Sequence, residues 1–84
     1  MFTIRFQTQN YRADLIIAIR SNVDGWNKDI PGIYQNDEWV FELPEEEYPA
    51  GMEFKFLLER NYWMFGNNIA LIPVDGGNYV FNEG

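Results

Sequence analysis

The feature that most constrains this chain is a stretch in which apolar and polar side chains alternate one by one. Between residues 52 and 59, every second position is apolar, and these positions are Met52, Phe54, Phe56 and Leu58. Successive side chains of a β-strand point to opposite faces of the sheet, so this set forms one apolar face against a core. Lys55 belongs to the other set and points toward solvent or a ligand. The stretch therefore predicts a strand.

Similar segments occur along the whole chain. Besides this stretch, the segments that favour strands are residues 2–7, 13–20, 37–43, 62–64, 69–72 and 79–81. Residues 13–20 are nearly continuously apolar, as expected of a strand central to a sheet. Turn residues separate the segments at intervals of about 8–12 residues, and no segment has the period of an amphipathic helix. We expect an all-β fold, an immunoglobulin-like antiparallel β-sandwich of six to seven short strands.

The length and the aromatic content bound the core. At 84 residues the chain is expected to form one domain, residues 1–84, and a domain of this size buries only about 60–65% of its unfolded surface. Seven Phe, five Tyr and three Trp are too many for so small a core, so some must lie at the surface, where aromatic side chains usually contact a partner. We expect the side chains inside to include Phe2, Ile4, Phe6, Ile17, Trp39, Phe41, Phe54, Phe56 and Leu58.

The composition excludes most kinds of catalysis and several partners. The chain has no Cys and no His, so it lacks thiolate ligands, the usual transition-metal ligand and the usual general base. We expect no enzyme activity, no metal and no cofactor. A net charge of −7 without a basic run disfavours nucleic acid and anionic membranes. No long apolar segment or signal peptide is recognisable, so we expect a cytoplasmic protein.

Two tryptophans, a lysine and two asparagines are the candidate binding residues. Trp26 lies in a polar loop after Asp24-Gly25, where it either stacks on a ligand or folds onto the edge of the sandwich. Trp63 follows the turn at residues 60–61, which returns the chain beside Lys55. Gly66 then introduces Asn67 and Asn68, whose carboxamides both donate and accept hydrogen bonds. Lys55 is either a solvated strand residue or part of the site.

Acidic residues suggest two other activities, and we favour neither. Asp24, Asn27 and Asp29 are too few for a calcium loop, which also needs a terminal Glu at a set spacing. Hydrolysis of a glycoside requires a cleft that holds two carboxyl groups at a set separation. A chain this short has little material for such a cleft.

Several short motifs follow one another in a familiar order. They are Gly25-Trp26, Leu43-Pro44 at the end of a strand, Glu53-Phe54-Lys55-Phe56, and Trp63 with Asn68 five residues later. From about residue 11 to residue 81, this order resembles the starch- and glycogen-binding carbohydrate-binding modules of families twenty and forty-eight. The resemblance implies an immunoglobulin-like sandwich that binds α-1,4-glucan without cleaving it.

The resemblance also implies roles for individual residues. The principal site of these modules maps onto Trp26, Lys55, Trp63 and Asn68, with Asn67 beside them. A second site maps onto Tyr11 and Tyr34, and Asn78 matches an asparagine of the glycogen-binding members. Because such modules are commonly attached to an enzyme that acts on the same polymer, a glucan-active enzyme is a further expected partner. The alternative is a protein-interaction or regulatory β-sandwich that has lost sugar binding.

Overall fold

The structure is a computed structural model that describes residues 1–8, 15–59, 62–63 and 68–82. These ranges contain nine strands and two short 3₁₀ helices. In chain order the elements are β1 (Phe2–Gln7), β2 (Ile17–Ser21), η1 (Asn22–Asp24), β3 (Ile30–Pro31), β4 (Ile33–Gln35), β5 (Glu38–Leu43), η2 (Glu45–Glu47), β6 (Met52–Leu58), β7 (Tyr62–Trp63), β8 (Ile69–Leu71) and β9 (Asn78–Asn82).

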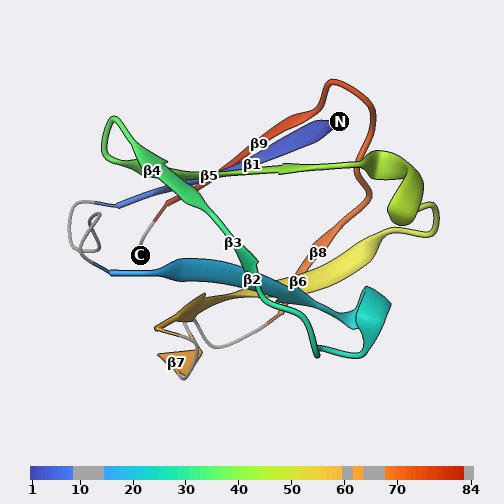
Figure 1. Cartoon of the computed structure of the whole chain (residues 1–84). Helices are drawn as coiled ribbons and strands as arrows, with labels where there is room; N and C mark the ends of the chain where they lie inside the picture. The colour runs from blue at the N-terminus through green and yellow to red at the C-terminus, as the bar shows by residue number, and fades with distance from the viewer. Residues whose placement is uncertain (9–14, 60–61, 64–67, 83–84) are drawn as a thin grey trace.

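The strands form two sheets that pack face to face (Figure 1). One sheet has the order β4-β5-β1-β9, and the other has the order β3-β2-β6-β7, with β8 also paired to β6. Neighbouring strands are antiparallel except β1 and β9, which are parallel. The predicted all-β sandwich is thus confirmed, with more strands than the six to seven expected.

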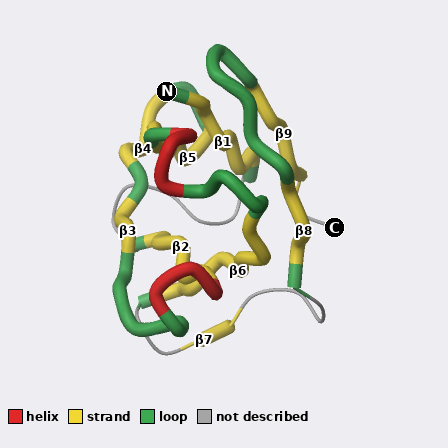
Figure 2. Tube along the Cα trace, turned by 90° about the vertical axis from the view of Figure 1, so that its right-hand side faces the viewer, coloured by secondary structure: helices red, strands yellow, loops and turns green. Residues whose placement is uncertain are grey.

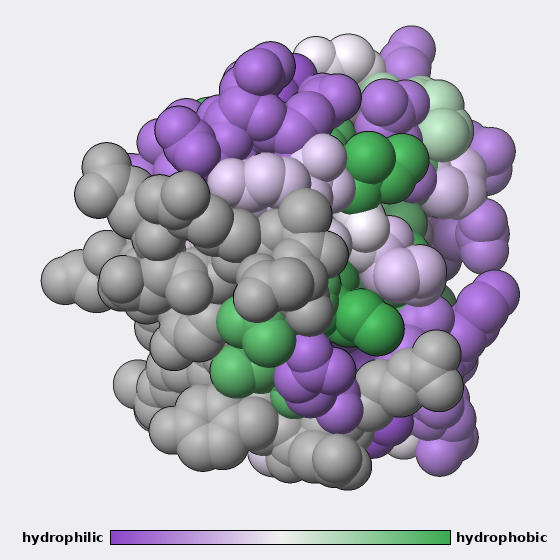
Figure 3. Space-filling model, turned by 60° about the vertical axis from the view of Figure 1, so that its left-hand side comes forward, coloured by the Kyte–Doolittle hydropathy of each residue, from purple (hydrophilic) through white to green (hydrophobic). Residues whose placement is uncertain are grey.

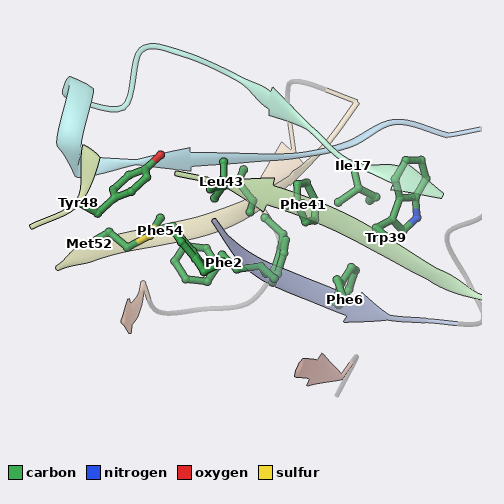
Figure 4. Close-up of a cluster of buried hydrophobic side chains, with 12 residues drawn as sticks. Phe2, Phe6, Ile17, Trp39, Phe41, Leu43, Tyr48, Met52 and Phe54 are labelled. Atoms are coloured by element: carbon green, nitrogen blue, oxygen red, sulfur yellow. The ribbon is translucent and has the colours of Figure 1, made fainter. Parts of the chain in front are cut away.

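The core lies between the two sheets and is rich in aromatic rings (Figure 4). Phe6 from β1 stacks on Phe56 from β6, with ring centroids 4.6 Å apart. Trp39 is 4% exposed and belongs to this core, as predicted. Leu58 packs against the core while remaining partly exposed. The other expected core residues are all buried, namely Phe2, Ile4, Phe6, Ile17, Phe41, Phe54 and Phe56.

The outer face of the second sheet differs from the expectation at one position. Leu57 belongs to the set of β6 residues that points away from the core, yet it is only 1% exposed. Its cross-strand neighbour is Ala18, which is 2% exposed, and Trp63 of β7 lies opposite it on the other side. This part of the outer face is therefore covered.

The strands β3 and β4 were not predicted, because each is too short to show alternation. Pro31 has no N–H to donate, and such a residue is tolerated on an edge strand like β3. The connection from β4 to β5 is a two-residue turn in which Asn36 and Asp37 have φ of 51° and 63°. Positive φ at both positions is the geometry of the type I′ hairpin turn, for which Asn and Asp are suited.

The segment before β2 also departs from the predicted strand over residues 13–20. Leu15 and Ile16 lie outside the strand, which begins at Ile17, and residues 13 and 14 are outside the described ranges. Among the described residues that Figure 3 shows, a few apolar side chains lie between hydrophilic ones. No helix within the described ranges has the length and apolar character needed to cross a membrane.

Candidate binding site

A tight backbone turn places Trp26 beyond the end of β2. The helix η1 ends at Asp24, its C-cap Gly25 has φ 73°, and the left-handed conformation continues at Trp26 with φ 66°. The Trp26 N–H donates a hydrogen bond of 2.9 Å to the carbonyl oxygen of Ser21. A bulky residue with positive φ is uncommon, and such positions cluster at functional sites.

The second tryptophan comes from β7, which, like η1, lies on the side of the β2–β6 sheet that faces away from the other sheet (Figures 1 and 2). The rings of Trp26 and Trp63 are 6.2 Å apart, with 82° between their planes. Trp63 is 40% exposed, and Trp26 is half-buried. The two indoles therefore form a corner of nearly perpendicular aromatic plates.

This corner opens into a hollow of about 240 Å³ that Trp26, Lys55, Trp63 and Asn68 line. Four of the five residues predicted for the principal site thus lie together around one surface depression. Asn67, the fifth, lies outside the described residues. The structure brings these side chains together from a loop, two strands and the residue before β8.

Two cations lie over the Trp63 ring. The Lys55 Nζ is 5.6 Å from the ring centroid, and the Arg20 Cζ is 5.7 Å from it. Arg20 and Lys55 are opposite each other in the register of β2 and β6, so both side chains stand on the outer face of the sheet. A cation over an indole is attracted by the negative face of the ring. Both contacts help to fix the orientation of Trp63.

Arg20 was not predicted as a site residue. It also forms an ion pair with Asp29, a residue of the loop before β3. Its position depends on the pairing of β2 with β6, so the only signal available in the sequence was that an arginine ends an apolar strand. Knowledge of how β2 pairs with β6 would have placed Arg20 beside Lys55.

The polar side of the hollow is held by hydrogen bonds. Asn68 donates through its Nδ2 to Oε1 of Glu53 at 3.5 Å. The N–H of Glu53 in turn donates to Oδ1 of Asn22 at 3.0 Å. Asp29 pairs with Arg20, and Glu53 lies two residues before Lys55 on the same face of β6, so two carboxylates accompany the two cations. This balance of charge suits a neutral, polar ligand better than a highly charged one.

The described lining of the hollow combines aromatic faces with hydrogen-bonding groups. It consists of two indoles, an ammonium and a carboxamide, and none of these groups is a carboxylate. Within the described ranges, no group of three or more acidic side chains is placed to hold a metal ion. In the loop considered for calcium, Asn27 donates through its Nδ2 to the carbonyl oxygen of Asp24 at 3.0 Å, and Asp29 pairs with Arg20.

The residues predicted for a second site lie elsewhere. Tyr34 is in β4, where its ring packs on Trp39 and its hydroxyl donates to Asp37 at 3.1 Å. Asn78 is in β9, at the opposite edge of the same sheet, and accepts a hydrogen bond of 2.9 Å from Arg5. Tyr11 is outside the described residues. Tyr34 and Asn78 do not form one site together, and the second site stays a prediction.

The chain matches no family model and no curated protein. A function for this chain is therefore inferred from the residues and geometry of the hollow.

Proposed function

We propose that this protein binds α-1,4-glucan, such as starch, glycogen or a maltooligosaccharide, without cleaving it. The observation that carries the proposal is the corner of two indoles, 6.2 Å apart and at 82°, with Lys55 and Asn68 at its rim. A glucose ring in such a chain has apolar C–H faces and a rim of hydroxyl groups. The corner offers a surface for each.

The angle between the plates provides selectivity. Each indole covers the apolar face of one glucose unit, and the removal of both faces from water is the main favourable term. Successive units of an α-1,4 chain turn relative to each other, so they can face two plates that meet at an angle. Units of a flat β-1,4 chain such as cellulose lie in one plane and can stack on only one of the two plates.

Hydrogen bonds to the hydroxyl rim add specificity more than affinity. Each exchanges a bond to water for a bond to protein and contributes about 0.5–1.5 kcal/mol net. The hollow is open, so we expect a Kd of roughly 10 µM to 1 mM, equivalent to about −7 to −4 kcal/mol. Lys55 donates to sugar oxygens, and Asn68 both donates and accepts.

Titration of the ¹⁵N-labelled protein with maltoheptaose, followed by NMR, tests the proposal. We expect the indole N–H signals of Trp26 and Trp63 to shift in a saturable manner while that of the buried Trp39 stays in place. Cellohexaose is the matched control ligand and should bind more weakly. If no indole signal moves at roughly 5 mM maltoheptaose, well above the weakest expected Kd, the proposed function is wrong. A protein-interaction role for the same aromatic corner would then be the one to pursue.

A further inference from the structure

A second hollow lies at the start of β6 and on the adjacent end of β8. Its volume is about 230 Å³, and its lining includes Asn22, Ala50, Gly51, Glu53, Ala70 and Ile72. None of these residues was a candidate from the sequence. The hollow combines a carboxylate and a carboxamide with small or apolar side chains.

The two hollows lie next to each other on the outer face of one sheet. Lys55 lines the first and Glu53 lines the second, and both side chains point outward from β6. Two residues along a strand span about 7 Å. The hydrogen bond from Asn68 to Glu53 joins one lining residue of each hollow, so this pair forms a wall that both share.

Small residues keep the second hollow open. Ala70 lies opposite Glu53 in the register of β8 and β6, and Ala50 is exposed beside it. Gly51 has φ 87°, and a Cβ there would lie 3.1 Å from the carbonyl oxygen of Leu71 and 3.2 Å from Cγ1 of Ile72. Glycine is therefore required at this position, and backbone forms part of the floor.

The sizes of the hollows favour a ligand that spans both. Pockets that enclose a whole small molecule usually measure about 300–1,000 Å³, and each of these hollows is smaller. Together they fall within that range. A polymer laid along the face can occupy the two in succession, whereas a compact small molecule would fill neither well.

We infer that the second hollow is an extension subsite for the same glucan chain, an inference that rests on the proposed function. The chain leaves the tryptophan corner, crosses the wall of Asn68 and Glu53, and places its next glucose units over Ala70 and Gly51. There the Glu53 carboxylate accepts hydrogen bonds from sugar hydroxyls, and Asn22 donates through its Nδ2. The protein thus recognises oligosaccharides longer than the disaccharide that covers the two indoles.

The test compares maltose with maltoheptaose on the wild type and on Ala70→Ile, which fills the second hollow and suits a strand. We expect the wild type to bind maltoheptaose roughly tenfold more tightly than maltose, from one or two added hydrogen bonds. Ala70→Ile should remove most of that gain while it changes the maltose Kd by no more than about twofold. Glu53→Gln should remove part of the gain in affinity for maltoheptaose over maltose. Amide signals of Ala50, Gly51 and Ala70 should shift with maltoheptaose only.

Two controls make the result decisive. Thr3→Ile and Glu42→Gln make matched changes at outward positions of the opposite sheet and should leave both Kd values unchanged.

A longer ligand also offers several overlapping disaccharide units, which raises its affinity statistically. If Ala70→Ile keeps the full gain and the three amide signals stay still, the gain is statistical and the subsite does not exist, although the tryptophan site stands. If neither sugar moves the indole signals, the proposed function itself fails.

Discussion

At the level of single residues, the three tryptophans have different roles: one belongs to the core and two form the candidate site. Trp39 is packed between the sheets and contacts Tyr34, whereas Trp63 keeps two fifths of its surface exposed. Trp26 lies between these extremes and adopts a backbone conformation that few bulky residues accept. Substitutions at the three positions should therefore affect stability and binding in different proportions.

We predict that Trp39→Ala and Trp63→Ala have opposite profiles. Loss of the buried Trp39 ring should cost about 3–5 kcal/mol of unfolding free energy, because it leaves a cavity in the core. Trp63→Ala should stay within about 1 kcal/mol of the parent and should lose most of the glucan affinity. Thermal unfolding and glucan titration of each variant check this. If Trp39→Ala is stable but cannot bind, and Trp63→Ala is unfolded, the binding site lies on the opposite face of the sandwich from the one proposed.

Trp26 allows a prediction about backbone strain. At φ 66° a residue with a Cβ pays roughly 1–2 kcal/mol that glycine does not. We expect Trp26→Gly to be more stable than Trp26→Ala by about 0.5–1 kcal/mol, while both variants lose glucan binding equally. Chemical denaturation of the two variants measures the difference. An alanine variant as stable as the glycine variant would show that the loop relaxes and that this strain is absent.

At the scale of elements, β6 supplies both the core and the site from its two faces. Its inward residues meet the aromatic core, and its outward Lys55 stands opposite Arg20 of β2. Two like charges directly opposite in an antiparallel pair are destabilising by about 0.2–1 kcal/mol. Asp29 offsets this repulsion through its ion pair with Arg20, and the Trp63 ring attracts both cations.

Asp29→Asn should therefore destabilise the protein more than an ordinary surface substitution. Arg20 and Asp29 are only 27% and 23% exposed, so water screens their attraction less than at an open surface. We expect a loss of about 0.5–1.5 kcal/mol at low salt and a smaller loss at about 1 M salt. In a Lys55→Gln background, Asp29→Asn should cost less, because the Asp29 carboxylate then has only Arg20 to attract. Equal costs in the two backgrounds would show that Asp29 and Lys55 do not interact.

For the molecule as a whole, a second cluster of charged groups surrounds the N-terminus, at the end opposite the candidate site. The α-amino group of Met1 donates hydrogen bonds to Glu45 at 2.6 Å and to Asp75 at 3.0 Å. In Figures 1 and 2 the N-terminus and β7 lie at opposite ends. These bonds raise the pKa of the amino group from 8.0 to about 10, with the Glu45 bond the largest cause. They also lower the pKa of Asp75.

A protein that begins at Met1 should lose stability as pH rises from about 8 to about 10. The pKa of the amino group is higher in the folded state than in the unfolded state, so its contribution is complete below pH 8 and disappears as the group deprotonates. Thermal unfolding across this interval measures the decline. Acetylation of the amino group should flatten the profile between pH 8 and 10. An equally steep decline after acetylation would assign it to another group.

Glucan affinity should not follow this change. The chain has no His or Cys, and the raised pKa of the amino group lies above the interval between about pH 6 and 8.5. We expect the Kd for maltoheptaose to be constant across that interval. Calorimetric titrations at several pH values would show it. A clear inflection would mean that a carboxyl group with a raised pKa takes part in binding.

The sequence determined which residues build each sheet face and the core between the sheets. Alternation with period two separates inward from outward side chains before any partner strand is known, so it identified the core residues of β1, β5 and β6. It also indicated that Trp26 lies in a loop. The short strands β3 and β4 could not be predicted in this way, because two or three residues cannot show a period. The resemblance, rather than the alternation, grouped Trp26, Lys55, Trp63 and Asn68.

Only the tertiary structure decided which residues of different strands are neighbours. The register of β2 against β6 sets Arg20 opposite Lys55, and that of β8 against β6 sets Ala70 opposite Glu53. A shift of one residue would turn either side chain to the other face. Register depends on contacts between segments far apart in the chain, and local patterns do not contain it. For that reason, the corner angle of the two indoles and the second hollow could not be predicted from the sequence.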